Sequence, residues 1–151
     1  MFDSQAVTFT VYGIPQSAGS KKGFPIRRKD GSVGVAITDS NPKGKDWKLA
    51  VAEEARKHFP EPLEGPLFMH VVFAMPRPKS HYRTGKNAWQ LKDSAPFHTT
   101  VMPDTTKLFR CLEDALKDIA WKDDSQVAVQ KAEKIYADKP HALVTIGRLE
   151  R

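Results

Sequence analysis

The sequence has little cysteine and no long apolar run, and both absences narrow the class of protein. A single cysteine, Cys111, excludes an intrachain disulfide framework and provides no zinc-finger spacing. No stretch approaches the roughly 20 apolar residues that a membrane-spanning helix needs. The first ten residues also lack the basic and apolar regions of a secretory signal. We therefore expect a soluble, cytoplasmic protein whose core folds without disulfides.

The chain is short and basic. Its 151 residues are the size of one domain with its own core. Lysine and arginine number 24 against 18 aspartates and glutamates, which gives a formal net charge of +6. This balance favours an anionic partner, although it also suits simple solubility. Ten of the basic residues fall in segments 21–29 and 77–92, and the second segment also holds His81, Tyr82 and Trp89. The clustering favours nucleic acid as the partner.

Hydrophobic periodicity predicts a mixed α/β (α+β) fold, with a single sheet backed by two main helices in one domain over residues 1–151. The predicted strands cover residues 7–12, 24–29, 32–38, 67–74, 126–136 and 142–147. Asp30 and Gly31 are a turn pair that suits a hairpin. The predicted helices cover about 46–58 and 104–120. A long basic loop at about 75–103 separates strand from helix, and loops of this length are usually functional or disordered.

The most informative stretch runs from Pro103 to Val127. Apolar residues recur there at positions 108, 111, 112, 115, 116 and 119, the spacing of one buried helical stripe. Asp104 is a good N-cap residue for this helix, and Asp123 and Asp124 lie in the turn after it. Each aspartate thus has an ordinary explanation as a cap or a turn former. The acids flank the helix, so they can meet only if the next strand turns back along it.

This stretch resembles the RusA family of Holliday-junction resolvases, small phage and prophage endonucleases. The family pattern is Pro-Asp-x-Asp-Asn-Leu-x-Lys, then Asp-Ala-Leu, then an aromatic residue shortly before Asp-Asp-x-Gln-Val. The corresponding segments here are 103–110, 114–116 and 121–127, with weaker similarity at 77–82 and 11–15. Three positions depart from the pattern. Thr106 replaces the second aspartate, Lys107 replaces asparagine, and Arg110 replaces a catalytic lysine.

The resemblance implies a Mg²⁺-dependent endodeoxyribonuclease, with Mn²⁺ as a substitute ion, that resolves four-way junctions and other branched DNA in the bacterial or phage-infected host cytosol. It aligns Asp104 and Asp124 with catalytic, metal-binding aspartates, and Mg²⁺ needs only one or two protein carboxylates. Arg110 is then a phosphate ligand that does not readily give up a proton. An i, i+4 salt bridge to Asp114 is the ordinary alternative for Arg110. Paired cutting implies a homodimer with twofold symmetry.

Other residues are candidates of a second rank. Asp123 is a further metal candidate, and Thr106, Lys107 and Asp114 are further site candidates. The DNA-binding candidates are Lys21, Lys22, Arg27, Arg28, Arg77, Lys79, His81, Tyr82 and Arg83. Two other hypotheses stay open at this point. One is a non-catalytic protein of the same fold that binds branched DNA, and the other is a small phage interaction protein whose positive charge is incidental.

Overall fold

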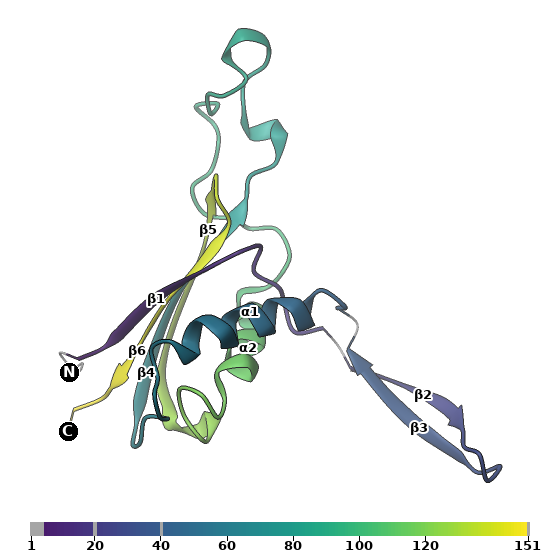
Figure 1. Ribbon diagram of the computed structural model, residues 1–151. Coiled ribbons are helices and arrows are strands. Elements are labelled where there is room, and N and C mark those ends of the chain that lie inside the picture. The colour runs from purple at the N-terminus through teal and green to yellow at the C-terminus, as the bar shows by residue number, and fades with distance from the viewer. Residues whose placement is uncertain (1–4, 20, 40, 151) are drawn as a thin grey trace.

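A four-stranded sheet forms the body of the protein (Figure 1). The computed structural model describes residues 5–19, 21–39 and 41–150, except for the side chains of residues 21, 22 and 37–39. The strands of this sheet are β1 (Val7–Tyr12), β4 (Leu67–Pro76), β5 (Val127–Ala137) and β6 (His141–Arg148). Their order is β1-β6-β4-β5. β6 pairs antiparallel with β1 and β4, whereas β5 pairs parallel with β4 and forms an edge.

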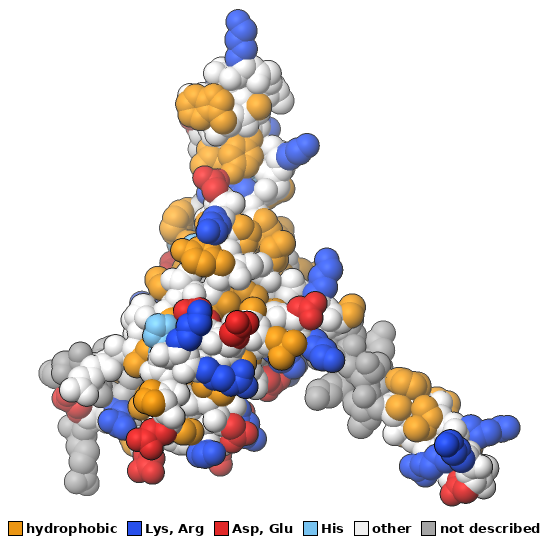
Figure 2. All heavy atoms as spheres, in the orientation of Figure 1, with side chains coloured by type: hydrophobic (Ala, Val, Ile, Leu, Met, Phe, Trp, Pro, Cys, Tyr) orange, Lys and Arg blue, Asp and Glu red, His pale blue; other side chains and the backbone are white. Residues whose placement is uncertain are grey.

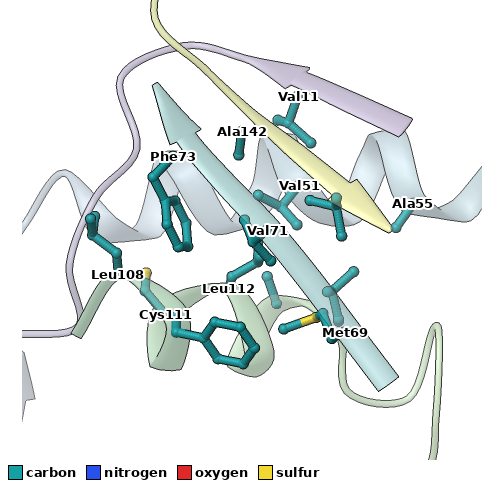
Figure 3. Close-up of a cluster of buried hydrophobic side chains, with 14 of the residues drawn as sticks. Val11, Val51, Ala55, Met69, Val71, Phe73, Leu108, Cys111, Leu112 and Ala142 are labelled. Atoms are coloured by element: carbon teal, nitrogen blue, oxygen red, sulfur yellow. The ribbon is translucent and has the colours of Figure 1, made fainter. Parts of the chain in front are cut away.

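Two helices, α1 (Gly44–Arg56) and α2 (Thr105–Leu116), pack on one face of this sheet. The core forms because alternate β4 residues and the apolar stripe of α2 bury each other (Figure 3). Phe73 and Leu112 have no exposed surface, and neither has Cys111, which is a core thiol. The predicted mixed α/β fold with a helix-backed sheet is confirmed.

The strand predicted over residues 67–74 corresponds to β4, which is central because it lies between β6 and β5. The face of β4 toward the helices is buried. Its second face is covered only in part, because Phe68 is buried whereas His70 and Val72 are half-buried. The His70 ring lies 5.1 Å from the Phe68 ring, so this histidine belongs to the packing of the sheet.

Two segments project from the body in different directions (Figure 1). The first is the predicted hairpin, formed by β2 (Lys21–Arg27) and β3 (Val33–Asp39), which is a separate two-stranded sheet. We call it the arm. The second is the segment 77–102 between β4 and α2, which contains two short 3₁₀ turns at Lys79–His81 and Gly85–Asn87. We call it the tower. A two-stranded ribbon alone is marginally stable in water, so the arm is suited to contact with a partner.

The second helix ends earlier than its sequence pattern predicts. α2 stops at Leu116 instead of Ala120, because Lys117 turns to a ψ of 138° and Asp118 adopts a φ of 68°. Aspartate tolerates this left-handed conformation better than most residues. The chain then folds back and buries Ala120 and Trp121 against the core. No helix in the described part of the chain combines the length and apolarity that crossing a membrane requires.

Candidate active site

Asp104 occupies the N-cap position of α2 in an extended conformation, with φ −66° and ψ 142°. Its backbone oxygen accepts a hydrogen bond from Leu108 N at 3.1 Å, but its carboxylate makes no capping hydrogen bond. Lys134 Nζ of β5 donates to the carbonyl oxygens of Val101 and Pro103, which fixes the backbone just before the helix. The exposed carboxylate of Asp104 is therefore available to a ligand instead of being used as a cap.

Asp123 has a structural role in the turn after α2. Its Oδ1 accepts hydrogen bonds from the backbone N and the hydroxyl of Ser125 at 2.9 and 2.8 Å. Gln126 Oε1 accepts from the backbone N of Asp123 at 3.1 Å, which completes a capping box for the 3₁₀ turn Asp124–Gln126. The two bonds from Ser125 lower the pKa of Asp123. The turn-forming alternative thus accounts for Asp123.

Asp124 lies differently from its neighbour. It is half-buried, and its Oδ1 accepts a hydrogen bond from the indole Nε1 of Trp121 at 2.8 Å. Trp121 is fully buried, so it is a rigid anchor for this carboxylate. The described residues provide no hydrogen-bond partner for the other carboxylate oxygen of Asp124. An anchored, half-buried carboxylate with one free oxygen is well suited to bind a cation.

Asp104 and Asp124 lie at opposite ends of α2. The helix between them has 12 residues and so is about 18 Å long. β5 does turn back along α2, since Gln130 bonds to Glu113 while Lys134 reaches Pro103. Asp124 precedes that strand, however, and stays near the C-terminal end of the helix. Within residues 5–19, 21–39 and 41–150, no three His, Cys, Asp or Glu side chains gather in a metal-binding cluster.

A cavity of about 310 Å³ lies between α2 and β5, and we call it the α2–β5 groove. Residues that line it are Thr106, Phe109, Arg110 and Glu113 from the helix and Gln130 and Ala132 from the strand. Thr106, Arg110 and Glu113 share one helix face, because their spacing is i, i+4 and i+7. The groove thus runs from the neighbourhood of Asp104 toward that of Asp124, and Arg110 lies between them.

The other second-rank candidates face away from the groove. Asp114 lines a separate cavity of about 570 Å³ between α1 and α2, where Lys48 Nζ lies 3.9 Å from its Oδ2. The described ion pairs include none between Arg110 and Asp114, so the salt-bridge alternative for Arg110 is wrong. Lys107 is exposed, and its backbone oxygen accepts a hydrogen bond from Ala18 N at 3.0 Å.

Glu113 is a groove residue that the sequence did not single out. It is half-buried, and Gln130 Nε2 donates to its Oε1 at 3.2 Å. Burial raises the pKa of Glu113, and the negative charges of Asp124 and Asp114 raise this pKa further. The helical spacing from Thr106 and Arg110 was the one sequence signal that could have indicated it.

Several tower residues that were DNA-binding candidates hold the tower on the sheet. Arg77 donates to the carbonyl oxygen of Pro96 at 2.7 Å and lies 5.2 Å from the centre of the Tyr136 ring. His81 packs edge-on against the same ring at 4.9 Å, and the hydroxyl of Tyr82 donates to Asp138 at 2.6 Å. These contacts orient the tower. Exposed groups of the tower include Lys79, Lys86, Trp89 and Lys92. Arg83 is paired with Asp93 at 3.2 Å.

The arm carries the other basic candidates. Arg27 and Arg28 are exposed near its tip, and the Arg28 guanidinium lies over the backbone of Gly34. The side chains of Lys21 and Lys22 lie outside the described part of the chain. Figure 2 shows lysine and arginine side chains at the outer end of the arm and along the tower, with exposed apolar groups between them. The groove is thus accompanied by two basic projections.

A mixed α/β fold with aspartates at both ends of a central helix and with two basic projections has the features of a DNA-directed nuclease. The chain belongs to the RusA family of endodeoxyribonucleases, because the family model for endodeoxyribonuclease RusA matches residues 21–147. It is also 33% identical over 141 residues to the uncharacterized protein YqaN of Bacillus subtilis strain 168. This match covers 93% of the chain and 94% of that relative. At the level of the family, membership indicates endodeoxyribonuclease activity on Holliday junctions in DNA recombination.

Proposed function

We propose that this protein is a Mg²⁺-dependent endonuclease that resolves four-way DNA junctions by paired phosphodiester hydrolysis in the cytosol of a bacterium or phage-infected cell. The observation that carries the proposal is Asp124, a half-buried carboxylate fixed by a buried tryptophan in the turn between α2 and β5. Family membership supports the chemistry, and the two basic projections support a large, branched anionic substrate.

The carboxylates that precede and follow α2 fit Mg²⁺, with Mn²⁺ as a substitute. Asp104 and Asp124 offer carboxylate oxygens, the hard ligands that these ions prefer, and the groove lining contains no cysteine or histidine. An ion held by these carboxylates would supply an activated water and neutralise charge that develops on the phosphate. Arg110 binds a phosphate oxygen through its permanently charged guanidinium. Thr106 adds a neutral hydroxyl that can orient a water molecule.

The separation of the two aspartates supports a homodimer. Asp104 precedes a helix about 18 Å long and Asp124 follows the other end of that helix, whereas ligands of one ion lie about 2 Å from it. Two chains related by a twofold axis can bring Asp104 of one chain to Asp124 of the other, and a four-way junction has matching symmetry. The proposed enzyme therefore has two composite active sites, one for each cut strand.

Cleavage of a labelled four-way junction tests the function. With Mg²⁺ we expect paired nicks at symmetry-related positions, and we expect a linear duplex of the same sequence to remain intact. EDTA should stop the reaction, and added Mn²⁺ should restore it. Binding without nicking would contradict the nuclease proposal and favour a non-catalytic junction-binding protein, an alternative that the neutral Thr106 supports. Neither binding nor nicking would favour an interaction protein with incidental charge.

Trp89 is the tower residue best placed to stack on an unpaired base, since 74% of its surface is exposed. Stacking of a base on an aromatic ring contributes about 1–3 kcal/mol. We expect Trp89→Ala to weaken junction binding about 5- to 100-fold, measured by fluorescence anisotropy with Ca²⁺ in place of Mg²⁺. Trp89→Phe keeps a ring and should retain most of the affinity. Equal loss in both variants, or in neither, would contradict a stacking role.

A further inference from the structure

The last part of the tower, segment 97–102, exposes several apolar side chains just before α2. Phe97 and Val101 are each 59% exposed. Met102 is 85% exposed, the highest value among the large apolar residues in the described part of the chain. Apolar residues exposed singly are ordinary on a protein surface, but three within six consecutive residues indicate a contact site. The segment ends two residues before Asp104, so this contact site adjoins the proposed active site.

The backbone on both sides of Met102 is held in place. Lys134 Nζ of β5 donates to the carbonyl oxygens of Val101 and Pro103 at 2.5 and 2.7 Å. Thr99 is buried, and its backbone N donates to the carbonyl oxygen of Lys134 at 3.1 Å. These bonds use the main chain of the segment and leave the side chain of Met102 in solvent. An apolar side chain on a backbone that is already ordered loses less entropy when it contacts a partner.

The charges near this segment favour DNA over a second protein surface as the partner. Exposed Lys107 and Arg110 follow on the first two turns of α2, and Lys134 lies beside the segment on β5. Glu133 of β5 is already paired with His98 at 2.8 Å. An apolar projection among basic side chains matches a nucleic acid, because phosphates lie on either side of the apolar faces of its bases.

We propose that Met102 inserts between adjacent bases of the junction, close to the cleaved phosphate, and so positions that phosphate for Asp104. This inference rests on the proposed function. Apolar side chains, methionine among them, partly unstack base steps in other DNA-binding proteins. Unstacking costs least where the base is already poorly stacked, which is the case at a branch point.

The spacing along the chain limits where the insertion occurs. Consecutive Cα atoms are about 3.8 Å apart, so the Cα atoms of Met102 and Asp104 are separated by at most about 7 Å. One base step spans about 3.4 Å along a strand. The unstacked step therefore lies within about three base steps of the cut.

Three variants separate insertion from a general effect of surface polarity. Met102→Gln keeps the length of the side chain but makes its end polar, and the bonds from Lys134 to the backbone do not depend on it. Met102→Leu keeps an apolar side chain. Leu49→Gln is the matched control, because Leu49 is 59% exposed on α1, where it lines the cavity between α1 and α2.

The adenine analogue 2-aminopurine, whose fluorescence rises when it unstacks, tests the inference without cleavage. It is placed singly at positions within about three base steps of the cut in a four-way junction. The full-length protein is then added with Ca²⁺ in place of Mg²⁺. We expect a rise in fluorescence at one of these positions with the unmodified protein, Met102→Leu and Leu49→Gln. Met102→Gln should lose this rise while it still binds the junction.

Other outcomes would overturn the inference, and they also distinguish it from the proposed function. An equal rise with Met102→Gln, or no rise with the unmodified protein bound to the junction, would overturn the role of Met102 and leave the proposed function intact. Dissociation of a Met102→Gln dimer in analytical ultracentrifugation without DNA would place Met102 against a second copy of the chain, and would overturn insertion. Failure of the unmodified protein both to bind and to cut the junction would overturn the proposed function together with the inference.

Discussion

Asp124→Asn abolishes junction cleavage in the proposed mechanism while junction binding persists. Asparagine has the same shape and retains an oxygen that can accept the hydrogen bond from Trp121 Nε1, so the turn should keep its structure. It removes the negative charge that binds the cation. Substitution of a residue that only supports a metal ligand already lowers metal affinity or activity about 10- to 100-fold. Loss of a direct ligand should therefore reduce the cleavage rate by at least about 100-fold. Single-turnover cleavage of a labelled junction measures the loss.

Asp123→Asn is the matched control for this prediction. It removes the same charge one residue away, and its amide oxygen can still accept both hydrogen bonds from Ser125. Cleavage should therefore remain close to that of the unmodified protein, with a similar Tm for both variants. Loss of cleavage in Asp123→Asn with full activity in Asp124→Asn would contradict the assignment. It would make Asp123 the metal ligand and leave Asp124 as the turn residue.

The elements of the fold were largely predictable because each has a clear local pattern. The strand predicted at residues 7–12 matches β1, and α2 begins at the predicted aspartate because Asp104 follows a proline and precedes an amphipathic stripe. The end of α2 was not predictable. No glycine or proline marks it, and the chain leaves the helix through the backbone angles of Lys117 and Asp118. Tertiary packing of Trp121 compensates for the shortened helix.

The residues of the candidate site could be predicted from the sequence only where a short, contiguous sequence pattern identifies them. The sequence pattern indicated Asp104 and Asp124 as candidates on either side of a helix, but it could not show whether the fold brings their carboxylates together. Glu113 was missed because its burial beside Gln130 depends on how β5 packs against α2. The internal contacts of Arg77 and Tyr82 likewise depend on Tyr136 and Asp138, which follow 59 and 56 residues later in the sequence. Long-range pairing thus decides which basic residues are free for DNA.

The distance between Asp104 and Asp124 leads to a prediction about mixed dimers. If each active site takes Asp104 from one chain and Asp124 from the other, a heterodimer of Asp104→Asn and Asp124→Asn chains contains one intact site and one doubly substituted site. Either homodimer contains none. We expect these heterodimers, isolated through different affinity tags, to nick one strand of a junction at about half the rate of the unmodified dimer, by the symmetry of the two sites.

The reciprocal heterodimer distinguishes this arrangement from a site held within one chain. Pairing an unmodified chain with a chain that carries both Asp104→Asn and Asp124→Asn keeps the same two substitutions per dimer. With composite sites, each site then lacks one carboxylate and cleavage should be lost. With sites complete in one chain, the unmodified chain would still cut, and the first heterodimer would be inactive. The two models therefore predict opposite outcomes for the same pair of samples. Active double-mutant heterodimers would contradict the composite site and require α2 to rearrange until Asp104 and Asp124 meet within one chain.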